Sequence, residues 1–270
     1  MKNIKLGFSF IIVLGLFTNG CMENPPSLVE SSNKDLPISK KQVREKSISI
    51  SQSSYKDLPI SKKQAVEVYK WLNKNFHKEL VKATKDTPFS ISLLSAIVAQ
   101  ESGYYLVKNH TMDYETNIIL KNCILDATGD IHGTRKAFPI NTLIFKSVYG
   151  NKLTNELIKE SNRAKKFRHI TSSSNYVYAG YGLFQYDLQY IKTDEKFFRN
   201  KEWYIFENIV EKVIKELSQK YKENKRNMRK TIISYNGSGK KAINYAKNVF
   251  FYNKVIEKEC NNFCFNRIKY

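Results

Sequence analysis

The chain has 270 residues, and its 45 Lys+Arg against 25 Asp+Glu give a formal net charge of +20. A positive field of this size favours polyanionic partners, such as nucleic acid, anionic lipid headgroups or a polymer that carries carboxylates. Much of the charge is also typical of a solvated, lysine-rich surface, so charge by itself does not choose among these partners.

The N-terminus has the pattern of an export signal. Two lysines precede a short apolar run from Leu6 to Phe17. This run is shorter than the roughly 20 residues that a membrane-spanning helix needs, so we predict that residues 1–20 are a signal peptide. The segment ending at Cys21 resembles a bacterial lipoprotein signal, which implies a lipidated Cys21 that attaches the chain to a membrane. An uncleaved signal, or ordinary cleavage nearby, is the alternative.

Export narrows the choice of partner and compartment. An exported chain is not expected to bind nucleic acid. The resemblance to lipoprotein signals, with Met22 rather than aspartate after the cysteine, implies the cell envelope, and in a Gram-negative organism the outer membrane facing the periplasm. Such a compartment is oxidising. Cys123, Cys260 and Cys264 therefore predict one disulfide and one free thiol, although the sequence does not say which pair forms. Metal binding by Cys260 and Cys264 is the alternative.

Residues 21–57 are predicted to be a tether. The nine-residue segment Lys34–Gln42 recurs identically as Lys56–Gln64. The first copy runs into a serine-rich, polar stretch with too little apolar area to fold. The second copy begins a helix, for which Ser61 is the expected N-cap. We therefore expect one folded domain over 58–270, about 210 residues and long enough for a sizeable core.

The folded domain is predicted to be mainly α-helical (α+β). The first helix should bury an apolar stripe at helical spacing, formed by Val66, Tyr69, Leu72, Phe76 and Leu80. Further helices are expected over 152–166, along the stripe from Trp203 to Tyr221, over 228–235 and from Ala242 onward, with a break at Gly237–Gly239. Residues 104–190 are rich in turns and are predicted to be less regular, with room for a small sheet.

One helix carries an acidic residue on its apolar face. Thr87–Ser90 is a helix start signal, Ile97, Val98 and Glu101 follow helical spacing, and Gly103 is the expected stop. Burial on such a face would raise the pKa of the carboxyl group and keep it protonated near neutrality. A protonated carboxyl in an apolar pocket is what a general acid for glycoside cleavage needs. The alternative is that Glu101 reaches water at the helix end.

Three short motifs follow one another along the chain. They are Ala99–Gly103 (AQESG), Gly180–Asp187 (GYGLFQYD) and Ser234–Gly239 (SYNGSG). Their order resembles the lytic transglycosylases of the soluble-lytic-transglycosylase type and their relatives, the goose-type lysozymes. The resemblance covers roughly residues 60–255. It implies a lysozyme-like domain that cleaves peptidoglycan glycan strands between N-acetylmuramic acid (MurNAc) and N-acetylglucosamine (GlcNAc), with no metal and no cofactor.

The resemblance also implies roles for individual residues. Glu101 matches the catalytic acid/base of the family. Gln185 matches a residue that contacts sugar, and the tyrosine and asparagine of the third motif match a pair near the catalytic carboxyl. The substrate-binding residues implied in this way are Ser102, Phe184, Gln185, Tyr235 and Asn236. Phe184 stands where the family usually has methionine, and Tyr245 stands where it often has an aromatic residue in the last helix.

Two features depart from the family pattern. Residues from about 104 to 178 separate the first two motifs where the family has a short connection, so we expect an insertion that caps the groove. Asp187 follows the second motif as in goose-type lysozymes, and is a possible second carboxylate. A loop aspartate beside glycine more often caps a turn, so a structural or positioning role is expected first.

Hydrolases of this class use two carboxyl groups, whereas lytic transglycosylases use one glutamate together with groups of the substrate itself. The single glutamate with an apolar setting therefore favours a lytic transglycosylase that leaves 1,6-anhydroMurNAc ends. The alternatives are a goose-type muramidase and a non-catalytic peptidoglycan-binding or secretion-apparatus protein. Aromatic residues cluster around the second motif, either as a sugar-binding strip or as ordinary core: Tyr176, Tyr178, Tyr181, Phe184, Tyr186 and Tyr190.

Overall fold

The computed structural model describes residues 58–125 and 138–267, and for Asn109 and residues 260–267 it describes the backbone only. The predicted signal peptide, Cys21 and the whole of the predicted tether lie outside the described residues, as do the side chains of Cys260 and Cys264. The described residues belong to one unit and are mainly helical, as the sequence pattern predicts.

The first helix, α1 (Lys62–Thr84), begins where its cap predicts. The Ser61 side chain accepts a hydrogen bond from the Gln64 backbone at 3.3 Å, and the Gln64 side chain accepts one from the Ser61 backbone at 2.9 Å. This reciprocal pair is a capping box. The buried stripe is shifted slightly from the expected one, because Ala65 and Val68 are buried while Val66 and Tyr69 are only half-buried.

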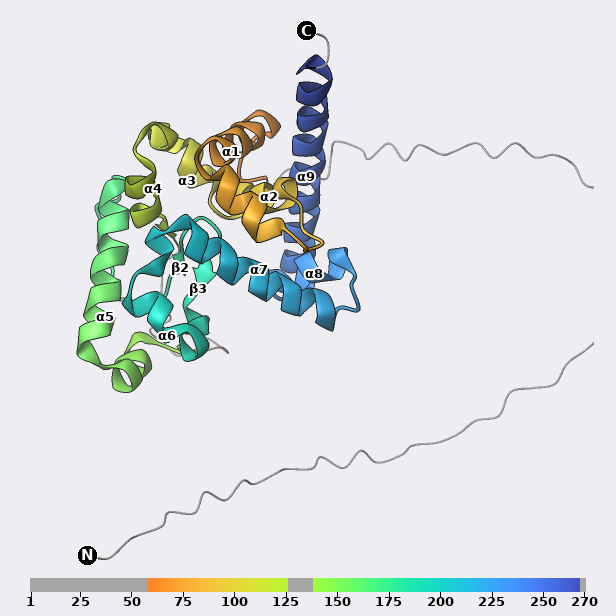
Figure 1. The fold of residues 1–270 in the computed structure, drawn as a ribbon. Coiled ribbons are helices and arrows are strands. Elements are labelled where there is room, and N and C mark those ends of the chain that lie inside the picture. The colour runs from red at the N-terminus through yellow and green to blue at the C-terminus, as the bar shows by residue number, and fades with distance from the viewer. Residues whose placement is uncertain (1–57, 126–137, 268–270) are drawn as a thin grey trace, which may run out of the picture. The chain divides into compact units, whose positions relative to one another are not determined.

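The central helix, α2 (Ile91–Glu101), is buried on all sides between α1 and α9 (Gly239–Arg267), as Figure 1 shows. Ser90 caps its first turn by accepting a hydrogen bond from the Leu93 backbone at 3.1 Å. Gly103 does not act as the expected helix stop, because the short helix α3 (Gly103–Val107) begins there. An added Cβ at Gly103 would lie 2.7 Å from Cδ1 of Ile60, so the Ile60 side chain would have to shift to accept any other residue.

The middle of the chain is more helical than expected. It contains η2 (Lys108–Asp113), α4 (Thr116–Asn122) and the long α5 (Thr142–Phe167), which bends at Gly150, where φ is +81°. The expected helix over 152–166 is the second half of α5, and it is partly buried through Leu153 and Leu157 rather than lying wholly at the surface.

The predicted small sheet is present. Its strands are β1 (Ile124–Leu125), β2 (Gly180–Tyr181) and β3 (Tyr186–Asp187), in the order β1-β2-β3 with antiparallel pairing. Ile124 pairs with Tyr181, and Tyr181 with Tyr186. The sheet lies between α5, which contacts β1, and α7 (Phe206–Glu223), which contacts β3 (Figure 1).

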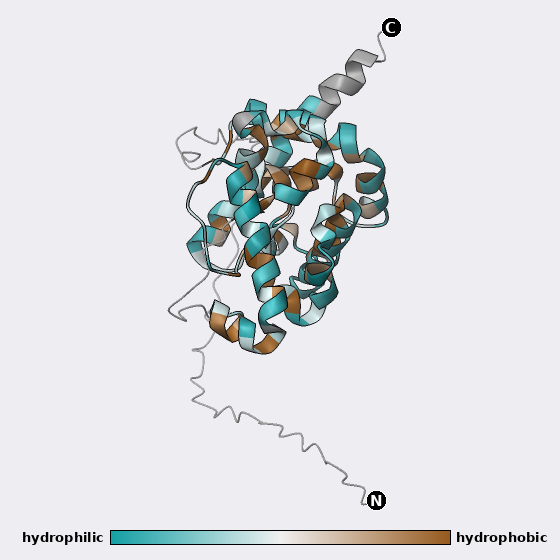
Figure 2. Ribbon diagram, turned by 90° about the vertical axis from the view of Figure 1, so that its left-hand side faces the viewer, coloured by the Kyte–Doolittle hydropathy of each residue, from teal (hydrophilic) through white to brown (hydrophobic). Residues whose placement is uncertain are grey.

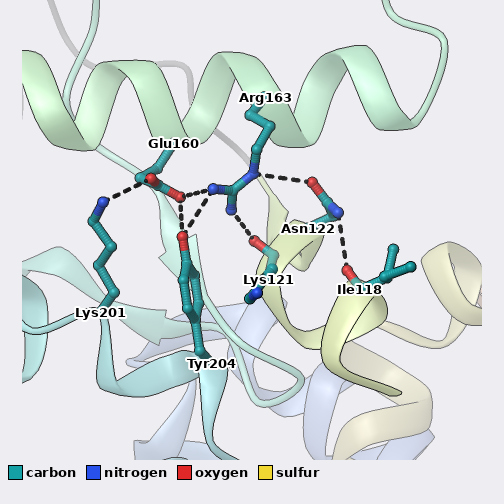
Figure 3. Close-up of polar contacts among 7 residues, drawn as sticks. All are labelled: Ile118, Lys121, Asn122, Glu160, Arg163, Lys201 and Tyr204. Atoms are coloured by element: carbon teal, nitrogen blue, oxygen red, sulfur yellow. Dashed lines mark hydrogen bonds and ion pairs between the residues drawn. The ribbon is translucent and has the colours of Figure 1, made fainter. Parts of the chain in front are cut away.

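A buried acidic residue joins α5 to the elements beside it. Glu160 is 5% exposed, and it accepts hydrogen bonds from Lys201 at 2.9 Å and from the Tyr204 hydroxyl, next to an ion pair with Arg163. Arg163 also donates to the Asn122 side chain of α4 at 3.3 Å (Figure 3). These contacts hold α5 against α4 and the turn η4 (Glu202–Tyr204).

The C-terminal half contains the predicted helix over 228–235 and two short helices that were not predicted. The remaining elements are η3 (Leu188–Tyr190), α6 (Ile191–Arg199) and α8 (Met228–Tyr235). Hydrophilic and hydrophobic residues alternate along the helices (Figure 2), as in elements that bury one face. Among the described residues, no helix is long and apolar enough to cross a membrane.

Candidate active site

The acidic residue singled out in the sequence lies at a helix end that is held in place. Glu101 is the last residue of α2 and is half-buried. The next residue, Ser102, is 1% exposed, and its hydroxyl donates a hydrogen bond of 2.7 Å to the Leu183 backbone carbonyl. The end of α2 is thus tied directly to the turn of the second motif.

The second motif forms a tight hairpin between β2 and β3. Gly182 and Gln185 both have positive φ, +72° and +53°. The Gln185 amide folds back across the turn, where its Nε2 donates to the Gly182 carbonyl at 2.7 Å. Gly180 must be glycine for this arrangement, because an added Cβ would lie 2.6 Å from Oε1 of Gln185. The hairpin therefore presents a fixed backbone and a fixed amide beside Glu101.

The third motif reaches the same place from the end of α8. The Tyr235 hydroxyl donates to the Phe184 backbone carbonyl at 3.2 Å, and its ring lies 6.3 Å from that of Tyr245 on α9. Burial, followed by the Glu101 carboxylate, raises the pKa of Tyr245 well above its usual value. Burial also raises the pKa of Tyr235, with further contributions from the carboxylates of Glu216 and Glu101.

One cavity of about 750 Å³ brings the three motifs together. Five of the residues selected from the sequence line it: Glu101, Gln185, Asp187, Tyr235 and Asn236. They come from α2, from the hairpin and from the end of α8, which are far apart in the chain. The cavity is the size of a pocket for a ligand of several rings.

Two of the residues expected to bind substrate lie elsewhere. Phe184 is 1% exposed and packs against Phe206, with ring centroids 6.2 Å apart. The Ser102 hydroxyl is used by the Leu183 carbonyl. Neither residue lines the cavity. In this structure both are therefore positioning residues, and the sequence pattern could not distinguish this because neighbours of a site residue share its motif.

Asp187 has the structural contacts expected of a turn aspartate. One of its carboxylate oxygens accepts the Gln189 backbone N–H at 2.7 Å and so caps η3, and the other accepts the Tyr178 hydroxyl. Asp187 still lines the cavity. Because both oxygens are engaged, the carboxylate is fixed in orientation, which agrees with a positioning role more than with a group that moves during a reaction.

Sequence reasoning missed a further carboxyl group in the cavity. Glu216 of α7 accepts a hydrogen bond of 2.5 Å from the Tyr190 hydroxyl, and its carboxylate lies 3.5 Å from Nζ of Lys220. Burial raises the pKa of Glu216 despite these contacts. The sequence feature that could have identified Glu216 is its position on the edge of the apolar stripe of α7, three residues after the buried Val213. An acidic residue at such an edge usually reaches water, so it did not stand out.

The aromatic residues around the second motif divide between the two interpretations offered by the sequence. Tyr178, Tyr186 and Tyr190 line the cavity, and the last two are stacked, with ring centroids 4.7 Å apart and planes 14° from parallel. Tyr181 is fully buried in the core beneath them. The cavity wall is therefore formed by tyrosines whose rings are fixed by packing.

Cys123, the cysteine whose side chain the structure describes, lies close to the hairpin. It is free and fully buried, and lies 3.8 Å from Nε2 of Gln185. Burial raises its pKa to about 12, so it is an inert packing group at physiological pH. Within residues 58–125 and 138–259, no cluster of His, Cys, Asp and Glu has the arrangement of a metal site.

Comparisons with known proteins add no evidence about the function of this chain. No protein-family model matches the chain, and neither the curated proteins nor the solved structures include a match.

Proposed function

We propose that this chain is a peptidoglycan lytic transglycosylase that cleaves the MurNAc–GlcNAc bond with Glu101 as the acid/base. The observation that supports this proposal is the convergence of all three motifs on one cavity. In this proposal the helical domain is lysozyme-like, and residues from about 104 to 178 are an insertion. The lipidated N-terminus would hold the enzyme in the cell envelope, next to its substrate.

The proposed reaction needs one protein carboxyl group. The protonated Glu101 gives its proton to the glycosidic oxygen as the C1–O bond of the muramic acid breaks. The 6-hydroxyl oxygen of the same sugar then forms a bond to C1, and its proton passes to the Glu101 carboxylate, which restores the acid. Glu101 is half-buried at the end of α2, and its carboxylate contributes to the raised pKa of the buried Tyr245, so the two groups lie close together.

The test is digestion of purified peptidoglycan, with the released fragments weighed by mass spectrometry. The parent protein should release 1,6-anhydro fragments, which are lighter by one water than hydrolysis products. Glu101→Gln keeps the shape of the side chain but has no proton to transfer, so activity should fall by at least ~10²-fold. Glu67→Gln, on the exposed face of α1, is the matched control and should be fully active.

Two results would overturn the proposal. Near-parental activity of Glu101→Gln would remove that residue from the chemistry. A parent protein that binds peptidoglycan but releases no fragments would favour the non-catalytic alternative.

A hydrolase is the second candidate, and Glu216 is the observation that favours it. A hydrolase needs a second carboxyl group to activate water or to form a covalent intermediate, and both Glu216 and Asp187 line the cavity. For a transglycosylase, Asp187→Asn and Glu216→Gln should each cost less than ~10-fold, which is about 1.4 kcal/mol of barrier. Reducing-end products, together with loss of activity in one of these variants, would instead assign a goose-type hydrolytic mechanism.

A further inference from the structure

Glu101 lines a second cavity in addition to the one that holds the three motifs. This cavity has a volume of about 260 Å³. Apart from Glu101, all of its lining residues lie between Tyr104 and Ile170, within the long segment that separates the first motif from the second. Because Glu101 lines both cavities, a long ligand that occupied both of them would pass this carboxyl group.

Exposed aromatic rings form one wall of this second cavity. Tyr104 is 57% exposed and Tyr114 is 49% exposed, which is high for side chains that bury large areas in most proteins. Tyr114 does not rotate freely, because Phe167 packs edge-on against it with ring centroids 5.2 Å apart. Exposed aromatic rings such as these, one of them held by packing, are suited to stacking against the apolar faces of sugar rings.

Cationic groups lie beside these rings. Nζ of Lys108 is 5.2 Å from the centroid of the Tyr104 ring, and Lys108 forms no ion pair with any described residue. Arg168 is held by hydrogen bonds from its guanidinium to the backbone carbonyls of Ile124, at 3.0 Å, and Ala164, at 3.2 Å. Among the described residues that line this cavity, Glu101 is the only acidic one. The wall beyond it therefore favours a ligand with negative charge.

We propose that this second cavity binds an anionic sugar of the same glycan strand, on the opposite side of the cleaved bond from the sugars in the larger cavity. The proposal rests on the proposed function, because it places Glu101 at the cleaved bond between the two cavities. The rings of Tyr104 and Tyr114 would stack on the sugar, and Lys108 and Arg168 would attract a carboxylate. That carboxylate belongs either to the lactyl group of muramic acid or to its attached peptide.

The test measures glycan binding in the full chain carrying Glu101→Gln, which prevents turnover. Three probes separate sugar from charge: a neutral GlcNAc oligosaccharide, a peptide-free GlcNAc–MurNAc oligomer and the same oligomer with its peptides. In this background Tyr104→Ala and Tyr114→Ala should each weaken binding of all three probes by about tenfold. Lys108→Gln should weaken binding of the charged oligomers only, and this effect should shrink in high salt.

The three probes also identify the carboxylate. A Lys108→Gln effect on the peptide-free oligomer assigns the lactyl group, and an effect only on the peptide-bearing oligomer assigns the peptide. The control is Leu143→Ala, an exposed residue of the same segment that lines neither cavity, and it should bind like the background protein.

Failure of this inference differs from failure of the proposed function. If the Glu101→Gln protein binds none of the glycans, the proposed function fails. If it binds them with a Kd that neither tyrosine substitution changes, the second cavity holds no sugar and this inference is wrong. Since Tyr104 and Lys108 are exposed, their substitution should leave the unfolding temperature unchanged, which excludes misfolding as the cause of weaker binding.

Discussion

Tyr235 connects the third motif to the other two. Its hydroxyl donates to the backbone of the hairpin at 3.2 Å, and its pKa responds to burial and to the carboxylates of both Glu216 and Glu101. The single proton of this hydroxyl goes to the Phe184 carbonyl, so the phenol oxygen can act on a nearby carboxyl group only by accepting a hydrogen bond from its protonated form. This is the physical basis for the role that the family resemblance implies.

We expect Tyr235→Phe to lower turnover by about tenfold or more, because it removes one hydroxyl from the cavity and nothing else. The lost hydrogen bond should reduce the free energy of unfolding by only about 1 kcal/mol. Fragment release from peptidoglycan and urea unfolding measure the two effects. Tyr221→Phe, a half-buried tyrosine outside the cavity, is the control. Full activity of Tyr235→Phe with reduced stability would leave Tyr235 a purely structural role.

At the scale of the elements, the buried Glu160 and the half-buried Glu216 have opposite electrostatic roles. Burial by itself would raise the pKa of Glu160, but hydrogen bonds from Tyr204 and Lys201 and the charge of Arg163 outweigh it and hold the pKa low. In Glu216 burial outweighs its partners, and the pKa is raised. Glu160 joins α5 to its neighbours (Figure 3), whereas Glu216 lines a cavity. Ionised Glu160 therefore stabilises the fold, and ionised Glu216 stabilises it less.

The two substitutions Glu160→Gln and Glu216→Gln should change stability in opposite directions at neutral pH. A lowered folded-state pKa adds stability above the unfolded-state value of about 4.3, and this stability is lost as the pH falls through the folded-state pKa. Glu160→Gln should therefore destabilise the protein at pH 7, by about 1–3 kcal/mol, and much less below about pH 4. A raised pKa works against stability once the group ionises, so Glu216→Gln should stabilise the protein at pH 7.

Urea unfolding of the parent and both variants at several pH values measures these differences. The prediction for Glu160 is wrong if its variant loses the same stability at every pH. Destabilisation of Glu216→Gln at pH 7 would show that its contacts with Tyr190 and Lys220 contribute more than burial costs.

At the scale of the whole molecule, the first described residues are tied to the last helix. Ile60 is 4% exposed, and its backbone N–H and carbonyl both hydrogen-bond the Tyr252 hydroxyl of α9, at 3.2 and 2.7 Å. The start of the folded unit is thereby fixed to its last helix. In the proposed function, a lipid at Cys21 would attach this unit to a membrane.

Cys21→Ser should release the protein from membranes, because stable anchoring needs the several acyl chains of a bacterial lipoprotein. Fractionation of cells that express each protein measures the release. A high-salt wash is the control, since salt removes a protein held only by its basic surface. Membrane association of Cys21→Ser that survives the wash would contradict lipidation.

The sequence by itself predicted several of the helices and several of the residues that meet at the cavity. Helix caps such as Ser61 and Ser90 and the 3.6-residue periodicity of apolar side chains are local signals, and they predicted α1, α2, α7 and α8. The order of the three motifs selected Glu101, Gln185, Asp187, Tyr235 and Asn236, which share one cavity.

Tertiary structure decided what depends on contacts between distant segments. It turned Ser102 and Phe184 inward, because the end of α2 and the hairpin pack on each other there. It brought Glu216 from the edge of a helix into the cavity. It also placed Tyr104 and Tyr114 with Glu101 in the lining of a second cavity. Burial and proximity are properties of the packed chain, and local sequence patterns do not encode them.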